Sequence, residues 1–261
     1  AFGEERDRAR LRDICQAEIE QTPRPPLLEQ LKEGKVPVVT GAPLGSGAYA
    51  ERLTAGGYPD AIQRTAPARL RFFRGYARSL LDRELPHLAH LRRPDVPLPL
   101  LNLIATRSAS ILNVASLARD LDVDENTALS HLKLLEDLML IHRIGPWYRN
   151  LGQRQIKAPK VVVTDPGLLC GLIGADAEGL AADPVLRGSV FETAVATELM
   201  KLASSSPTPP GFFHYRDAKQ REVDLLLEWP DGSIVAVEVK AGTNVGSDDL
   251  RSLRYLRDKL G

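Results

Sequence analysis

The chain has 261 residues, of which 43% are hydrophobic and 26% charged, as is ordinary for a globular protein. Lys plus Arg and Asp plus Glu number 34 each, so net charge gives no argument for a nucleic-acid or membrane partner. Cys15 and Cys170 lie far apart without metal-ligand spacing, which indicates reduced thiols. Because no apolar run approaches the roughly 20 residues of a membrane span and no signal peptide is recognisable, we expect a cytoplasmic protein. Since the first residue is Ala1, we also expect a piece of a longer chain.

The first hundred residues read as mainly helical. A charged stretch over 4–20 predicts an exposed helix that ends at the proline-rich residues 22–26. Apolar spacing predicts further helices over 27–31, 48–53, 66–91 and 98–106, and a strand over 36–40. The glycines of 41–47 suggest a phosphate loop, but the Gly-Lys-Ser/Thr ending is missing, so we expect no nucleotide site there.

Residues 111–144 are typical of a winged helix-turn-helix, which we place at about 108–150. Helices over 114–121 and 125–138 are separated by a turn, with Asp124 as the N-cap of the second. In DNA-binding members of this class the second helix enters the major groove through its first residues. Here Asp124 and Glu125 stand at that position, and their charge opposes phosphate. Packing or protein contact therefore stays open as an alternative use of the motif.

A basic stretch follows, with no acidic residue between positions 141 and 163. Basic side chains interleaved with aromatic ones can bind a nucleic-acid backbone and stack on its bases. The alternative is a solvated wing whose aromatic residues pack on the neighbouring domain. The residues that we expect to bind nucleic acid are Arg143, Trp147, Tyr148, Arg149, Arg154, Lys157 and Lys160.

The last hundred residues alternate strands and helices. We predict strands over 161–164 and 212–215 and helices over 168–173, 183–202 and 248–260. Glu192 lies at the edge of the apolar stripe of the 183–202 helix, and Glu198 lies on the stripe itself. A carboxylate on that stripe needs a partner, because burying an unpaired charge is costly.

The segment from Glu222 to Lys240 predicts a β-hairpin around the turn Pro230-Asp231-Gly232. If the turn is centred on Asp231, Asp224 and Glu238 face each other. Two like charges in directly opposed positions repel unless a cation lies between them. Mg²⁺ or Mn²⁺, which prefer hard oxygen ligands, would resolve the conflict.

These residues carry a resemblance to a known superfamily. Asp224, followed by Glu238-Val239-Lys240 on the next strand and preceded by a helix with Glu192, resembles the PD-(D/E)xK nucleases. The resemblance implies metal-assisted hydrolysis of a phosphodiester, with the metal on Asp224 and Glu238, Lys240 acting on the attacking water and Glu192 completing the catalytic site. The alternative is a salt-bridged strand with a solvated outer face.

The order of motifs from about residue 53 resembles a second family, the region that follows the nucleotide-binding module in bacterial and archaeal AAA-type P-loop ATPases. No Walker motif occurs in this chain, so ATP enters only through an upstream module. We therefore expect residues 1–60 to be the tail of such a module, 61–150 a helical block with the winged helix, and 151–261 the nuclease-like domain. Partners implied by these resemblances are DNA, the ATPase module or a second copy of the chain, and no membrane.

The sequence thus predicts an α/β protein with a helical and winged-helix N-terminal half and a restriction-endonuclease-like core. Two functions follow as hypotheses. The first is a nucleic-acid-interacting part of an ATPase that hydrolyses phosphodiesters with Mg²⁺. The second is a non-catalytic interaction and regulatory module in which the same acidic residues and lysine form a structural cluster.

Overall fold

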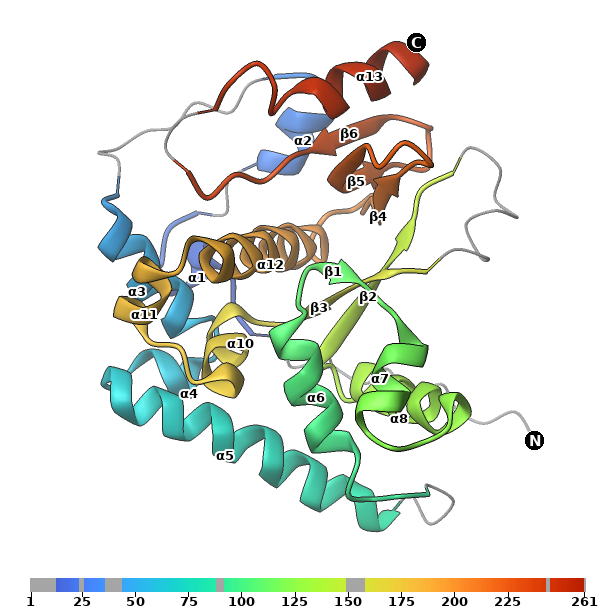
Figure 1. Ribbon diagram of the computed structural model, residues 1–261. Helices are drawn as coiled ribbons and strands as arrows, with labels where there is room; N and C mark the ends of the chain where they lie inside the picture. Colours follow the sequence, from blue (N-terminus) through green and yellow to red (C-terminus); the bar gives the residue numbers. More distant parts are fainter. Residues whose placement is uncertain are drawn as a thin grey trace, which may run out of the picture.

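A computed structural model describes residues 13–23, 26–35, 44–87, 92–148, 158–242 and 245–260. Within these ranges the protein is a mixed α/β structure of twelve α-helices, one short 3-10 helix and a six-stranded mixed sheet (Figure 1). None of the helices in these ranges is both long and apolar enough to cross a membrane. The predicted strand at 36–40, most of the first predicted helix and the 41–47 loop up to residue 43 lie outside the described residues.

The N-terminal part is helical, as expected. Leu100, Leu101 and Ile104 of α6 are buried beside Phe73 and Leu81 of α5. Pro67 and Pro97 stand in the first turns of these two helices, where a missing N–H costs nothing. The elements are α1 (Gln16–Ile19), α2 (Leu27–Lys32), α3 (Ser46–Ala55), α4 (Pro59–Ile62), α5 (Ala66–Glu84), η1 (Leu85–His87) and α6 (Pro97–Thr106).

Two short helices and three strands come next. The strand β1 (Ser110–Ile111) precedes α7 (Val114–Asp120) and α8 (Glu125–Asp137), and β2 (Ile141–Pro146) and β3 (Lys160–Val163) follow them. The predicted cap is present, since the Asp124 carboxylate accepts a hydrogen bond from the Thr127 N–H at 3.0 Å. Strand β3 lies between β1 and β2 and pairs antiparallel with both.

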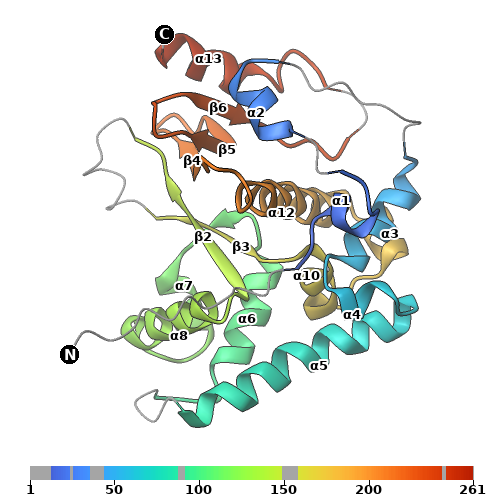
Figure 2. The ribbon, with the colours of Figure 1, turned by 180° about the vertical axis from the view of Figure 1, so that it is seen from behind.

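The C-terminal strands form an antiparallel meander that joins the same sheet. They are β4 (Gly211–Arg216), β5 (Glu222–Glu228) and β6 (Ile234–Val237). Parallel pairing of Gly145 with Phe213 and of Pro146 with His214 connects β2 to β4. The strand order is therefore β1-β3-β2-β4-β5-β6, and Figure 2 shows β2 and β3 running from the helix pair to the meander. The domain boundary that we expected at residue 150 falls inside this sheet, between β2 and β3.

Helices α12 (Pro184–Ala203) and α13 (Arg251–Leu260) cover the meander on opposite faces. Leu225 and Leu227 pack with residues of α12, whereas Leu226 packs with Leu253 and Leu256 of α13. This follows from the two-residue period of a strand, which sends alternate side chains to opposite faces. The other two helices, α10 (Pro166–Ile173) and α11 (Ala177–Ala182), contact α3 and α12 instead; α11 was not expected from the sequence.

The contact of α10 with α5 yields a first prediction. A Cβ atom on Gly171 would lie 2.3 Å from the Phe73 Cβ, and both residues are buried. Gly171→Ala should therefore lower the free energy of unfolding by about 1 to 3 kcal/mol, as overpacking does. Gly188→Ala in α12 is the matched control, because no atom lies within 4 Å of its added Cβ. Alanine should stabilise that helix by about 0.5 to 1 kcal/mol. Urea unfolding of the two variants measures both effects, and equal stabilities would contradict the close packing.

Candidate functional site

The hairpin brings its two acidic residues together as predicted. Leu225 pairs with Val237 and Leu227 with Val235, so the turn is centred on Asp231 and residue 224 stands opposite residue 238. One carboxylate oxygen of Asp224 accepts a hydrogen bond from the Val239 N–H at 2.9 Å. Burial raises the pKa of Glu238, and the negative charge of Asp224 raises it further. Register alone thus places Asp224 beside the Glu-Val-Lys segment.

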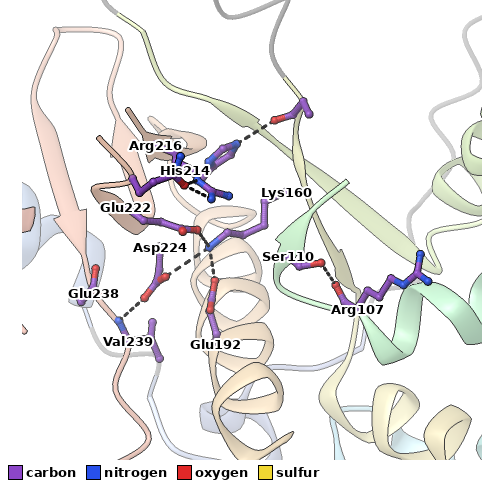
Figure 3. Close-up of polar contacts among 12 residues, drawn as sticks. Arg107, Ser110, Lys160, Glu192, His214, Arg216, Glu222, Asp224, Glu238 and Val239 are labelled. Atoms are coloured by element: carbon purple, nitrogen blue, oxygen red, sulfur yellow. Dashed lines mark hydrogen bonds and ion pairs between the residues drawn. The ribbon is translucent and has the colours of Figure 1, made fainter. Parts of the chain in front are cut away.

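A lysine from another strand contacts Asp224 and two further carboxylates, Glu192 and Glu222 (Figure 3). The ammonium of Lys160, the first residue of β3, lies 2.5 Å from Glu192 Oε1 on α12. It also lies 3.5 Å from Asp224 Oδ1 and 3.4 Å from Glu222 Oε1, both on β5. Only 1% of the Lys160 side chain is exposed, against 20% for Glu192 and 14% for Asp224. A buried cation is therefore surrounded by three carboxyl groups, of which Glu222 is the most exposed, at 38%.

Burial and charge act in opposite directions on this cluster. Burial lowers the pKa of Lys160, but the negative charges of Glu192, Asp224 and Glu222 outweigh it and raise that pKa above its ordinary value. Burial raises the pKa of Glu192 to about 7, and Asp224 adds to this shift while Lys160 opposes it. Lys160 thus keeps its charge at neutral pH, and Glu192 titrates near neutrality.

The neighbouring His214 is uncharged at neutral pH. Burial and then the charge of Lys160 lower the pKa of this imidazole to about 4. Its Nε2 lies 3.3 Å from the carbonyl oxygen of Ala158. The only positive charge buried against the three carboxylates in the described residues is therefore the ammonium of Lys160.

The other two residues of the predicted site, Glu238 and Lys240, pair with each other and not with the Lys160 cluster. The Lys240 ammonium lies 2.7 Å from Glu238 Oε1 and 4.0 Å from Asp249, so it is paired within its own loop. No described residue is a hydrogen-bond partner of Glu238 Oε2, although that atom is buried. Glu238 and Lys240 therefore form a pair of their own, beside the cluster around Lys160.

This arrangement does not fit a divalent metal. Asp224 and Glu192, which would contribute oxygen ligands, already contact an ammonium, and the third acid, Glu238, is engaged with Lys240. No set of three or more His, Cys, Asp or Glu side chains in the described ranges is arranged to hold a metal ion. Of the two carboxylates that we expected to hold Mg²⁺, Asp224 contacts the Lys160 ammonium and Glu238 contacts the Lys240 ammonium.

The structure separates the residues that we expected to bind nucleic acid. Arg149, Arg154 and Lys157 lie outside the described residues, and for them the expectation stays a prediction. Trp147 is 4% exposed and its indole N–H donates to Glu228 at 3.1 Å, so its ring belongs to the core. Lys160 is 1% exposed, so neither side chain is accessible to a phosphate or a base in the folded protein. Those two assignments are corrected. The exposed Arg143 pairs with Glu136 at 2.9 Å, and Tyr148 is partly buried.

The central role of Lys160 was missed, although the sequence held a signal for it. Lys160 opens the run Lys-Val-Val-Val, and all four residues of this strand are buried. A lysine in a fully buried strand must find carboxylate partners, because an unpaired buried charge is too costly. The identity of those partners depended on contacts 32 to 64 residues away in sequence.

A second buried ion cluster lies farther along α12. Lys201 pairs with Asp13 and lies 4.0 Å from Asp165, whose two oxygens accept the N–H groups of Gly57 and Leu168. Burial, followed by the charge of Asp13, raises the pKa of Asp165 to about 7. The predicted need of Glu198 is also met, since it accepts the Gln16 N–H at 2.8 Å. These contacts attach the segment that begins at residue 13 to α12.

Comparisons with known proteins now define the class. Residues 46–179 match the model of a family described as a domain of unknown function, DUF8612, and residues 187–261 match a second domain of unknown function, DUF4143, which often follows AAA-type ATPase domains. The chain therefore belongs to the DUF8612 family.

Two curated mycobacterial proteins are similar to the chain. Uncharacterized proteins of Mycobacterium bovis and Mycobacterium tuberculosis are each 30% identical to it over 188 residues. The match covers 71% of this chain but only 41% of each relative. No solved structure matches.

The pKa of Glu192 gives a second prediction. The pKa of Glu192 is about 7 in the folded protein, whereas its ordinary value is 4.5. Between pH 4.5 and pH 7 the folded protein therefore holds a proton on Glu192 that the unfolded chain has released. Its contribution to stability is therefore present below about pH 4.5 and is lost as pH rises to about 7. Relative to Glu192→Gln, the free energy of unfolding of the wild type should fall by up to about 1.4 kcal/mol per pH unit in that window.

Urea unfolding from pH 4.5 to 8 measures this difference. Other titrating groups cancel because they are common to both proteins. Glu178→Gln, at an exposed position of α11, is the matched control and should give a curve parallel to that of the wild type. A parallel curve for Glu192→Gln as well would contradict the burial of Glu192 as an acid.

Proposed function

We propose that this chain is a non-catalytic interaction module of an AAA-type ATPase, in which the acidic cluster is structural. The observation that carries the proposal is the Lys160 ammonium, 1% exposed and in contact with Glu192, Asp224 and Glu222. A phosphodiester-hydrolysing site needs its carboxylates free for a metal. Here they neutralise a lysine of the same chain, and no reaction step is assigned to them.

The α/β half resembles a nuclease core that serves as a scaffold. The order α12, β4, β5, β6, α13 and the placement of Glu192, Asp224 and Glu238 support the PD-(D/E)xK resemblance. Loss of chemistry with retention of a fold is common, because function resides in a site and not in the fold. Lys160 supplies the positive charge that such a cluster of acids requires.

The front half supports a winged helix that is suited to protein contact. The order α6, β1, α7, α8, β2, β3, with β3 between β1 and β2, supports this assignment. The exposed charges of α8 are Glu125, Lys133 and Asp137, and Lys133 pairs with Asp137 at 3.1 Å. Leu129 on the same helix is 42% exposed. A net negative face with an apolar residue is poorly suited to a phosphate backbone.

Two observations support an association with an ATPase: the match to the DUF4143 family, and the greater length of the curated relatives. The DUF4143 match and the coverage of 41% of longer relatives support a module that works beside another part of a protein. No Walker motif occurs in these 261 residues. Nucleotide chemistry therefore belongs to a separate module in this proposal.

A third prediction tests the structural role of Lys160. Mg²⁺ or Mn²⁺ at millimolar concentration should leave the melting temperature of the wild type unchanged, because the carboxylates are already paired. Lys160→Ala should cost about 3 to 5 kcal/mol, since it leaves buried anions without their cation. The same divalent ions should then raise the melting temperature of that variant, because three carboxylates surround the vacated place.

Two further variants separate the proposal from its alternative. Lys219→Ala, at an exposed position before β5, is the control and should behave as the wild type with and without metal. Asp224→Asn removes one of the partners of Lys160 and should melt below the wild type in metal-free buffer. Stabilisation of the wild type by Mg²⁺, together with an unchanged Asp224→Asn, would favour the metal-dependent nuclease and overturn the scaffold role.

A further inference from the structure

Among the described residues, the backbone groups on the outer edge of strand β6 pair with no other strand. Strand β6 is the last in the order of the six-stranded sheet, and the Trp229 N–H donates to the Ser233 carbonyl at 2.9 Å. In an antiparallel pair, hydrogen-bonded positions alternate with positions whose N–H and C=O groups point away. The register therefore directs Val235 and Val237 toward β5 and directs Ala236 and Glu238 outward. No strand in the described ranges pairs with this outer edge.

A groove of about 300 Å³ lies beside the end of this edge. It runs between α12, the end of β6 and the segment before α13. Its apolar lining comprises Phe191, Val195, Val237, Val239, Leu250 and Leu253. Val245, another lining residue, is 59% exposed. The rings of Phe191 and Tyr49 pack edge to face, with their centroids 6.1 Å apart. Because Tyr49 lies on α3 and is 45% exposed, the apolar surface continues onto that helix.

The polar rim of the groove carries a net negative charge. Glu238 and Asp249 lie on it with a single cation, Lys240, which contacts both. The two carboxylates and one ammonium sum to a charge of minus one. Lys240 is also the more exposed member of its pair with Glu238, at 36% against 14%. A ligand with a basic group is the electrostatic complement of this rim.

We propose that β6 and this groove bind an extended segment of a partner protein that carries apolar and basic residues in alternation. The partner's backbone pairs with the outward groups of Ala236 and Glu238, as in other cases of strand addition. Its alternate side chains enter the groove, and a Lys or Arg lies against Glu238 and Asp249. This inference rests on the proposed function as an interaction module and assigns that module its binding surface.

A partner segment fits this surface better than a second copy of the chain. A second β6 would bring another rim of the same net charge to the same edge, and like charges across an interface disfavour pairing. An extended segment of a partner needs only one strand and one anchoring side chain. A groove of about 300 Å³ is at the lower end of the range for ligand sites, which suits a side chain.

Defined peptides test the proposal. The probes are fluorescein-labelled eight-residue peptides in which valine alternates with lysine, glutamine or glutamate, and binding is measured by fluorescence anisotropy at low ionic strength. The Val-Lys peptide should bind a few-fold more tightly than the Val-Gln peptide, and the Val-Glu peptide should bind most weakly. Asp249→Asn should reduce the preference for lysine. Equal affinities of the Lys and Glu peptides would overturn the charge argument.

Ala236→Pro tests the backbone pairing. Proline removes an N–H that points away from β5, and edge positions of this kind tolerate it. Binding of the Val-Lys peptide should weaken about tenfold, the equivalent of about 1.4 kcal/mol. Ala236→Ser, which keeps the N–H, is the matched control and should bind as the wild type. Equal binding by the Pro and Ser variants, both folded by thermal melts, would overturn the proposal.

Analytical sedimentation tests whether a second copy of the chain, and not a partner segment, binds at the edge of β6. Self-association of the wild type that is lost in Ala236→Pro would overturn the partner assignment in favour of a dimer through β6. A monomeric wild type that binds the Val-Lys peptide supports the partner. Failure of the proposed function is recognised separately, because stabilisation of the wild type by Mg²⁺ would overturn the scaffold role and leave the peptide results unchanged.

Discussion

The ion cluster around Lys160 is the interaction on which the arrangement of the sheet depends. The lysine belongs to β3, Glu192 to α12, and Asp224 and Glu222 to β5, so a single ammonium connects three elements that are distant in sequence. A charge that is 1% exposed is stable only when several anions compensate its lost hydration. The cost of separating these groups favours one relative position of the helical half and the meander.

The cluster also explains why the two halves form one sheet. The β2–β4 pairing covers only two residue pairs, Gly145 with Phe213 and Pro146 with His214. Such a short parallel contact contributes little by itself. Lys160 reinforces it from the neighbouring strand, and Trp147 adds an indole N–H bond to Glu228 next to it.

Local patterns were enough to predict much of the fold. Helical spacing predicted α3, α5, α6, α7, α8 and α12, and turn chemistry predicted the register that sets residue 224 opposite residue 238. These features depend on neighbours within one or two elements. The occupant of the acidic site could not be predicted in this way, because Lys160 reaches Asp224 across 64 positions. Trp147 could not be assigned from local sequence either. Its basic and aromatic neighbours suggested a nucleic-acid contact, but the folded structure buries it in the core.

The most direct measurement is a double-mutant cycle between Lys160 and Glu192. Urea unfolding at pH 8, where Glu192 is mostly ionised, is compared for the wild type, Lys160→Met, Glu192→Gln and the double variant. If the ammonium is held by this carboxylate, the two changes will not be additive, and the coupling free energy will be about 1 to 3 kcal/mol. Additive effects, within about 0.5 kcal/mol, would contradict a structural ion pair at the centre of the site.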